Sequence, residues 1–211
     1  MVSTNRVVGV ILAGGRSSRM GGGDKCLLPL GGRPVLASVL ARLRPQVSDL
    51  IINANGDASR FADFGLPVIA DTVGGLAGPL AGVHAGLEWV KANAPGVGYI
   101  VTVASDTPFF PSDLVHRFLA ELKEHPALLV ATSEEGVHPV VGLWPVAMAP
   151  QLEDSLAQGM RKVGAWTKQH GAREVFFAPI EVGGRHVDPF FNINRPEELA
   201  EADALLQAAS P

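Results

Sequence analysis

Residues 7–25 read VVGVILAGGRSSRMGGGDK, six apolar residues that are followed at once by a glycine-rich loop. A short apolar run bounded by turn residues indicates a strand in the interior of a sheet. In an open α/β sheet, ligands bind beyond the carboxyl ends of the strands, and the loop after the first strand is the usual phosphate site. The sequence therefore predicts a strand over 7–12 with a ligand-binding loop behind it.

The composition of this loop favours a phosphate ligand. Glycines let the backbone approach a phosphate closely and point successive N–H groups at it, while Arg19 and Lys25 add charge-assisted contacts. The alternative is that Gly14 and Gly15 form a tight strand-to-helix turn and the two cations are solvated. Five glycines within residues 14–25, together with these cations, favour a triphosphate cradle. The loop matches neither G-x-G-x-x-G nor the P-loop pattern.

Further apolar runs alternate with stretches of helical periodicity over the first part of the chain. The periodic stretches are Leu36 to Leu43 and Leu114 to Leu122, the second with Ser112 as its expected N-cap. This alternation is typical of a three-layer α/β sandwich, a mostly parallel sheet with helices on both faces and a Rossmann-like first half. The expected strands are Val7 to Leu12, Leu50 to Ala54, Pro67 to Ala70, Tyr99 to Ala104 and Leu128 to Thr132.

The second part of the chain has a less regular pattern. We expect it to complete the same sheet, so that the 211 residues form one domain. Residues from about 7 to 133 would bind a nucleotide, and residues from about 134 to 208 would form the acceptor side. The expected elements are strands at His138 to Trp144 and Glu174 to Ala178, helices at Val146 to Gln158 and Lys162 to His170, and a terminal helix starting at Asn194-Arg195-Pro196.

Composition and charge exclude several classes of protein. The formal net charge of −4 argues against a nucleic-acid partner, since binding duplex phosphates normally needs a basic face. No apolar run approaches the roughly 20 residues that cross a bilayer, and the N-terminus lacks a cleavable signal, so we expect a cytoplasmic protein with no membrane partner. The single cysteine, Cys26, is interpreted as a packing residue, and the histidines lack zinc-ligand spacing.

Asp106 is the strongest candidate for catalysis. It follows the apolar run Tyr99 to Ala104, which places a carboxylate at the open edge of a buried strand. Mg²⁺ takes carboxylate and phosphate oxygens and keeps several waters, so one well-placed aspartate can suffice. The alternative is a structural role as the cap of the helix after Pro111.

Other polar or glycine-rich segments also follow predicted strands. Asn53 ends the second strand, where its amide can donate to and accept from a purine edge, or else form an Asx turn. The segment Gly78-Pro79-Leu80-Ala81-Gly82 is expected to begin a helix, with Pro79 in the first turn and room for a base or ribose against the backbone.

Asn192 and Asn194 lie two residues apart, so in an extended segment their side chains share one face. Asn194 also suits the N-cap position before Pro196, and the sequence leaves both roles open for it. Asn192 has no such capping role. We expect the pair to face the metal and an acceptor phosphate.

In order and approximate spacing, these motifs resemble the molybdenum cofactor guanylyltransferases, and the resemblance covers nearly the whole chain. Cytidylyltransferases for molybdopterin usually have Leu-Ala-Ala-Gly where this chain has Leu-Ala-Gly-Gly, so Gly14 favours GTP. The family usually has a small residue or cysteine in place of Ser105. The matching segments are Leu12-Ala13-Gly14-Gly15-Arg16-Ser17-Ser18-Arg19-Met20-Gly21 with Asp24-Lys25, Ile52-Asn53-Ala54-Asn55, Gly78-Pro79-Leu80-Ala81-Gly82, Ser105-Asp106-Thr107-Pro108 and Phe191-Asn192-Ile193-Asn194-Arg195-Pro196-Glu197-Glu198-Leu199.

The resemblance implies a nucleotide-diphospho-sugar transferase type of fold and a set of substrates. These are GTP and molybdenum-loaded molybdopterin, whose terminal phosphate would receive GMP with Mg²⁺ as cofactor and pyrophosphate as the leaving group. Catalysis would rest on positioning and charge neutralisation, with no covalent intermediate and no dedicated general base. The resemblance also implies transient contact with other cofactor-biosynthesis proteins and with molybdoenzymes, and we expect a monomer.

The resemblance also assigns roles to individual residues. Asp71 would lie at the nucleotide, or else act only as a turn residue. His138-Pro139 and Gly159-Met160-Arg161-Lys162 would lie near the pterin, with a solvated basic turn as an equal alternative. The catalytic set would be Arg19, Lys25 and Asp106, with Asp106 as the metal ligand, and the binding set Leu12, Ala13, Gly14, Gly15, Lys25, Asn53, Asp71, Gly78, Pro79, Leu80, Asp106, His138, Arg161, Asn192 and Asn194.

Three rival functions remain at this point. A transferase of the same fold could use CTP with molybdopterin, or GTP with another phosphorylated acceptor such as a cobinamide. A nicotinamide or flavin oxidoreductase is disfavoured because the chain has neither G-x-G-x-x-G nor an acidic residue ending the second strand. A non-catalytic cofactor carrier is disfavoured because Arg19, Lys25 and Asp106 are all present.

Overall fold

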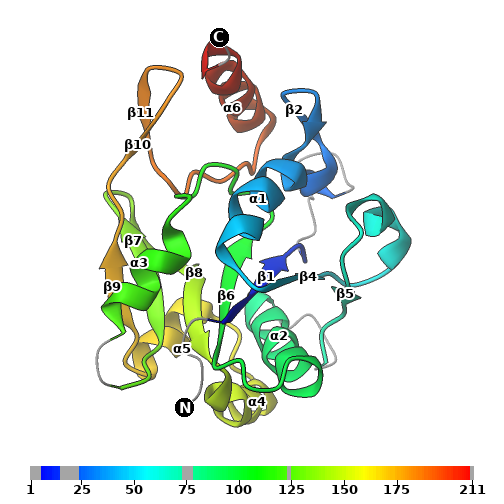
Figure 1. The fold of residues 1–211 in the computed structure, drawn as a ribbon, viewed down its shortest axis with the longest axis vertical. Helices are drawn as coiled ribbons and strands as arrows, with labels where there is room; N and C mark the ends of the chain where they lie inside the picture. Colours follow the sequence, from blue (N-terminus) through cyan, green and yellow to red (C-terminus); the bar gives the residue numbers. More distant parts are fainter. Residues whose placement is uncertain (1–5, 15–23, 73–77, 123–124, 210–211) are drawn as a thin grey trace.

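The apolar run Val7–Leu12 forms β1, which is buried along its whole length in the middle of a seven-stranded sheet. The computed structural model describes residues 6–14, 24–72, 78–122 and 125–209. The strand order is β5-β4-β1-β6-β8-β7-β9, and only β8 runs against the others, so the predicted mostly parallel sheet is confirmed (Figure 1). The other strands are β4 (Asp49–Asn53), β5 (Val68–Ile69), β6 (Tyr99–Ala104), β7 (Leu129–Ser133), β8 (Gly136–Pro145) and β9 (Arg173–Phe176).

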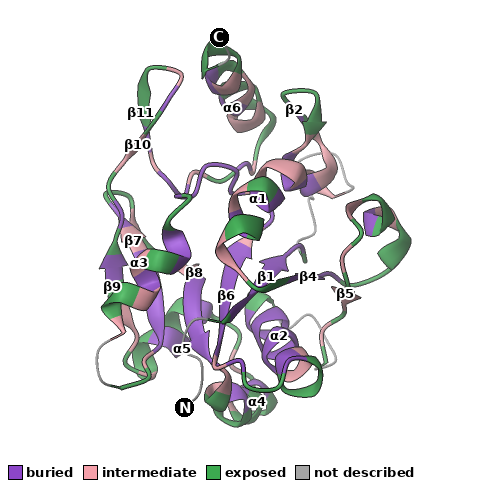
Figure 2. Cartoon of the chain, viewed as in Figure 1, coloured by how far each residue is buried: buried purple, intermediate pink, exposed green. Residues whose placement is uncertain are grey.

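Helices cover both faces of this sheet, because alternate residues of each strand point to opposite sides. One face packs against α1 (Val35–Leu43) and α3 (Leu114–Glu121), and the other against α2 (Pro79–Asn93), α4 (Ala149–Ala157) and α5 (Val163–Gln169). Figure 2 shows the resulting buried residues along β1, β6 and β8. No helix in the described ranges is long and apolar enough to cross a membrane.

A third, smaller core lies at one end of the molecule. The last helix, α6 (Pro196–Ala209), packs there beside two short hairpins, β2–β3 (Pro29–Leu30 and Arg33–Pro34) and β10–β11 (Ile180–Val182 and Arg185–Val187) (Figure 1). Both hairpins turn through Gly-Gly pairs with positive φ, which suits the tight turns that match the twist of paired strands. The sequence analysis missed these hairpins, although Gly31-Gly32 and Gly183-Gly184 were their signal.

The strand register brings several loops to one edge of the sheet. Leu12 lies opposite Asn53 on one side and Ala104 on the other, so β1, β4 and β6 end level with one another. The antiparallel β8 starts at this same edge, since Thr102 of β6 pairs with Gly142. The loops that follow the three parallel strands therefore meet the first residues of β8.

Two expected helix starts differ in the structure. Asp113, not Ser112, precedes α3, and no side chain caps it; Leu114 N–H instead bonds to the carbonyl of Pro111, which closes the turn through the backbone. The helix expected at 146–158 begins as a 3-10 turn over Val146–Met148, and α4 starts only afterwards. Pro150 explains this, because its ring lacks an N–H and would clash with the carbonyl four residues earlier.

Helix α2 approaches the sheet closely through two glycines one turn apart. A Cβ atom on Gly86 would lie 2.8 Å from Val10 Cγ2 and 3.3 Å from Ile100 Cδ1. A Cβ atom on Gly82 would lie 2.2 Å from Asn53 Oδ1. The absence of these side chains lets the start of α2 lie directly beside the ends of β1 and β4.

We expect Gly86→Ala to lower the free energy of unfolding by about 1–2 kcal/mol. Overpacking typically costs about 1–3 kcal/mol, and the better helix propensity of alanine returns at most about 1 kcal/mol. Gly98→Ala is the matched control, because a Cβ there meets no atom within 4 Å. Urea unfolding measures both variants; equal midpoints for Gly86→Ala and the wild type would show that α2 does not need this close approach.

Candidate active site

Lys25 and Asp106 form an ion pair at the edge where β1, β4 and β6 end. Lys25 Nζ lies 2.7 Å from Asp106 Oδ2 and also donates to Asn194 Oδ1 at 2.8 Å. The side chains of Lys25 and Asp106 are 18% and 17% exposed, so the pair is shielded from solvent but not closed off. Asp106 does not cap the following helix, since α3 has no side-chain cap. The three residues come from distant parts of the sequence, and the fold brings them together.

The segment that carries Asn192 and Asn194 is fixed to the backbone of Asp106. Ile193 N–H donates to the Asp106 carbonyl at 2.9 Å, and the Ile193 side chain is buried in the core beside α6. The neighbouring asparagines turn the other way: Asn194 reaches Lys25, and Asn192 Oδ1 accepts a hydrogen bond from Thr107 Oγ1. The structure therefore brings both predicted asparagines to the edge where Asp106 lies.

The start of α6 is stabilised by Glu198, and the side chain of Asn194 points elsewhere. Glu198 Oε2 accepts hydrogen bonds from the backbone N–H groups of both Asn194 and Arg195, at the start of α6. This is the reciprocal half of a capping box, in which an acidic residue in the first turn reaches back to the preceding N–H groups. The Asn194 side chain instead accepts a hydrogen bond from Lys25 Nζ through its Oδ1, so the N-cap interpretation of this side chain was wrong.

Asn53 and Asp71 belong to a second polar cluster at the end of β4. Asn53 is only 4% exposed, and its Nδ2 donates to the Ile69 carbonyl at 3.3 Å and to Asp71 Oδ1 at 3.0 Å. Asn55 binds Asp71 twice, since its Nδ2 donates to Oδ2 at 2.8 Å and its Oδ1 accepts from the Asp71 N–H at 2.9 Å. Asp71 is thus held on both carboxylate oxygens.

This cluster changes the expected roles of the two asparagines. Both amide hydrogens of Asn53 are used within the protein, so reading a purine edge would require Asn53 to leave these bonds. Its role in the described structure is to hold Asp71. Asn55 is the exposed amide of the cluster, and no role of its own was predicted for it from the sequence. Its place two residues after Asn53, beyond the strand end, was the signal that could have found it.

His138 lies in a third cluster, with Ser133 and Asp188. Ser133 Oγ is 2.7 Å from His138 Nε2, and the same hydroxyl donates to Asp188 Oδ2. The His138 ring also packs on Phe190, with centroids 4.6 Å apart. Burial lowers the pKa of His138 below its usual 6.5, while Asp188 and Glu135 act in the opposite direction and offset part of the effect.

The start of α2 and Arg161 lie next to each other. Gly78 has φ of +69° and precedes Pro79 in the first turn, as the sequence predicted. The Arg161 carbonyl oxygen would be 3.7 Å from a Cβ on Gly78. Arg161 Nη1 donates to the carbonyls of Leu156 and Met160, both at 2.8 Å, at the end of α4. The structure therefore places Arg161 beside the start of α2, with part of its guanidinium already engaged.

Only part of the glycine loop lies within the described residues. Ala13 N–H bonds to the Asn53 carbonyl at 2.8 Å, and the Leu12 carbonyl accepts from Ser105 N–H at 3.1 Å, while Gly14 is exposed. Gly15 and Arg19 lie outside the described residues. Where the chain is described again, Asp24 forms an ion pair with Arg60 at 2.6 Å, which ties the end of the loop to the segment after β4.

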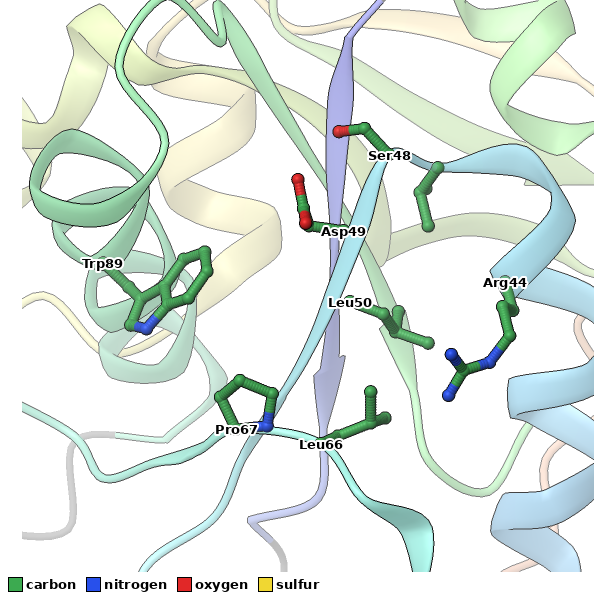
Figure 3. Close-up of a pocket in the computed structure, with 8 residues that line it drawn as sticks. Arg44, Ser48, Asp49, Leu50, Leu66, Pro67 and Trp89 are labelled. Carbon is green, nitrogen blue, oxygen red and sulfur yellow. The ribbon is translucent and has the colours of Figure 1, made fainter.

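Two further features are a buried thiol and a groove. Cys26 is buried, and burial raises the pKa of its thiol to about 11, so it remains a protonated packing residue. A groove of about 260 Å³ lies at the start of β4, the end opposite Asn53 (Figure 3). It is lined by Arg44, Val47, Ser48, Asp49, Leu50, Leu66, Pro67 and Trp89. Within the described ranges, no three His, Cys, Asp or Glu side chains form a metal-binding group.

Comparisons with known proteins identify the family and the fold of the chain. Residues 9–174 match the model of the MobA-like NTP transferase domain. The chain is 49% identical to the molybdenum cofactor guanylyltransferase of Mesorhizobium japonicum over 96% of this chain and 97% of that protein.

Two solved structures show the same fold. The first is the molybdopterin-guanine dinucleotide biosynthesis protein A of Archaeoglobus fulgidus, with a TM-score of 0.68 and 22% identity over 95% of this chain and 99% of that one. The second is a Mycobacterium tuberculosis protein in complex with manganese, with a TM-score of 0.65 and 20% identity over 94% of this chain and 98% of that one. The expected nucleotidyltransferase fold is confirmed. On the strength of the domain match and of the near full-length relative, the chain belongs to the MobA-like NTP transferase family.

Proposed function

We propose that this chain transfers GMP from GTP to the terminal phosphate of molybdenum-loaded molybdopterin, forming molybdopterin guanine dinucleotide and pyrophosphate. The observation that carries the proposal is the convergence of Lys25, Asp106 and Asn194 at the edge of the sheet where the glycine loop begins. The choice of substrates is supported by the name of the relative that is 49% identical. A cytoplasmic location, a monomeric state and transient contacts with other biosynthetic proteins and molybdoenzymes stay predictions.

The residues at this edge fit a divalent cation. The Lys25 ammonium shows that a cationic group is held there by a carboxylate oxygen and an amide oxygen, at 2.7 and 2.8 Å. Mg²⁺ prefers such oxygen ligands and is often held by one or two carboxylates plus substrate phosphates. We propose that Asp106 holds Mg²⁺ with the help of Asn192 or Asn194. When bound, the ion would neutralise charge on the phosphates and polarise the reacting phosphorus.

The remaining side chains have separate roles in the proposed transfer. An oxygen of the acceptor phosphate attacks the α-phosphorus of GTP, a new P–O bond forms, and the bond to pyrophosphate breaks. The attacking oxygen is already anionic near neutral pH, so no residue needs to remove a proton. Lys25 would leave Asp106 to stabilise the charge on the departing pyrophosphate, and the amides at the end of β1 would do the same. Asp71 and Asn55 are placed to hold the nucleoside.

The direct test of the proposed function is pyrophosphate release from GTP, with and without the molybdenum-loaded acceptor. We expect release only when both are present, and a strong preference for GTP over CTP and ATP. Release with CTP at an equal rate would contradict the choice of nucleotide. Release with a phosphorylated acceptor other than molybdopterin at an equal rate would contradict the choice of acceptor.

We expect Asp106→Ala to fold but to lose transfer by about 100-fold or more, because it removes the main protein ligand of the metal. Asp113→Ala is the matched control, since Asp113 is an exposed aspartate later in the same loop and caps nothing. Circular dichroism checks the fold, and pyrophosphate release measures the rate. Turnover at the wild-type level in Asp106→Ala would disprove the metal role.

Lys25→Ala is expected to weaken GTP binding and to slow transfer together, because a phosphate contact acts in both the ground state and the transition state. A hydrogen bond to a charged group contributes about 1.5–3 kcal/mol, which corresponds to roughly ten- to hundredfold in affinity. Lys91→Ala serves as control, since Lys91 forms an ion pair with Glu88 on an exposed helix face. Unchanged GTP affinity and rate would mean that Lys25 only balances the charge of Asp106.

Variants in the two polar clusters should separate the substrates. We expect Asn192→Ala to weaken binding of molybdopterin more than of GTP, because Asn192 lies on the C-terminal segment, and Asp71→Ala to do the reverse. Calorimetry with each ligand alone measures the split. Arg161→Ala is a third variant. Although Arg161 lies beside the start of α2, we expect this variant to weaken binding of molybdopterin more than binding of GTP. Equal losses of both ligands in Asn192→Ala would contradict the division.

A further inference from the structure

The hydroxyl of Ser133 makes three hydrogen bonds, and counting protons fixes the direction of each. Ser133 Oγ is 2.7 Å from His138 Nε2, 3.2 Å from the Glu135 N–H, and bonded to Asp188 Oδ2. A hydroxyl has one proton to donate and two lone pairs to accept with. A carboxylate can only accept, so the proton of Ser133 goes to Asp188, and Glu135 N–H uses one lone pair. His138 Nε2 must therefore carry a hydrogen and donate it to the second lone pair.

This arrangement decides which nitrogen of the neutral imidazole is free. A neutral histidine carries one N–H, so Nδ1 of His138 must have an open lone pair. Burial lowers the pKa of His138, which keeps the ring neutral at neutral pH. Among the described residues, Nδ1 of His138 has no hydrogen-bond partner. It is also not among the fully buried polar atoms that lack a partner, so it is not closed off from solvent. Nδ1 is therefore an accessible hydrogen-bond acceptor.

The place of this nitrogen in the fold connects it to the acceptor side. His138 lies near the start of β8. If the antiparallel pairing is continued beyond Thr102 and Gly142, it places His138 at the edge of the sheet where β6 ends, just before Asp106. Its ring packs on Phe190, two residues before Asn192. Asp188 begins this same segment, since its Oδ1 accepts the Phe190 N–H at 2.7 Å. One carboxylate thus orients the histidine and the chain that carries the site asparagines.

We propose that Ser133 and Asp188 are positioning residues that hold His138 as its Nε2–H tautomer, so that Nδ1 accepts a hydrogen bond from an N–H or O–H group of the acceptor substrate. The second part of this proposal rests on the proposed function. The first part concerns only the free protein. Neither Ser133 nor Asp188 touches the reacting atoms in this arrangement; both act through His138.

The isosteric change Asp188→Asn gives a sharp test, because it should reverse the tautomer. Oδ1 of residue 188 is held by the Phe190 N–H, so an asparagine would keep its oxygen there and turn its NH₂ group toward Ser133. Ser133 Oγ would then accept from that NH₂ and from Glu135, and its own proton would go to His138 Nε2. Nδ1 would become the N–H, a donor in place of an acceptor.

The measurement is a long-range ¹H–¹⁵N correlation spectrum of the imidazole rings at neutral pH without ligands. The chain has six histidines, and a His138→Gln variant identifies the signal of His138. We expect a protonated Nε2 in the wild type, a protonated Nδ1 in Asp188→Asn and a mixture in Ser133→Ala. Ser59→Ala is the matched control, because it removes a Ser–Asp hydrogen bond from an exposed turn and should leave the His138 signal unchanged. A wild type with Nδ1–H, or an unchanged tautomer in Asp188→Asn, would overturn the proposal.

Calorimetry then tests whether the acceptor meets Nδ1. We expect Asp188→Asn to weaken molybdopterin binding about tenfold, the scale of one lost hydrogen bond, and to leave GTP binding unchanged. A reversed tautomer with full molybdopterin affinity, or a loss confined to GTP, would overturn the role of Nδ1. A wild type that binds no molybdopterin would instead contradict the proposed function, while the tautomer measured without ligand would still stand.

Discussion

The contact of the Lys25 ammonium with Asp106 and Asn194 is the interaction on which the rest of the site depends. It joins the end of the glycine loop, the end of β6 and the segment before α6. Along the chain, Asp106 lies 81 residues and Asn194 169 residues after Lys25. A charge buried to this extent is stable only when it is paired, so all three segments must reach the same point. Under the proposed function, Mg²⁺ would take the place of this ammonium beside Asp106.

Around this contact, further polar groups are held by hydrogen bonds from neighbouring residues. Glu198 Oε2 accepts the backbone N–H groups of Asn194 and Arg195, while Asn194 Oδ1 accepts from Lys25. Asn53 and Asn55 hold both oxygens of Asp71. A functional group keeps its orientation only when surrounding hydrogen bonds fix it, and these bonds supply that support on both sides of the edge.

Sequence reasoning predicted the fold well because strand and helix signals are local. Val7 to Leu12 and Tyr99 to Ala104 agree with β1 and β6 residue for residue, and the position of Asp106 at a strand end followed from the second run. The partners of Asn53 and Asn194 could not be predicted, because they depend on contacts with residues that lie 16 to 169 positions away in the sequence. The same holds for Ser133 and Asp188, which have no local pattern. The roles of Gly15 and Arg19 stay predictions, since both lie outside the described residues.

The position of Asn194 near the end of the chain also determines when the proposed site is completed during protein synthesis. The parallel strands β5, β4, β1 and β6 are all complete by residue 104, so this part of the sheet can form while the ribosome is still adding residues. Asn192 and Asn194 emerge only after the whole sheet, including β9, has been synthesised. Until then Asp106 and Lys25 have each other but lack the third member of their cluster. A nascent chain that stalls in between therefore contains every strand of the sheet's parallel half but still lacks part of the proposed reaction centre.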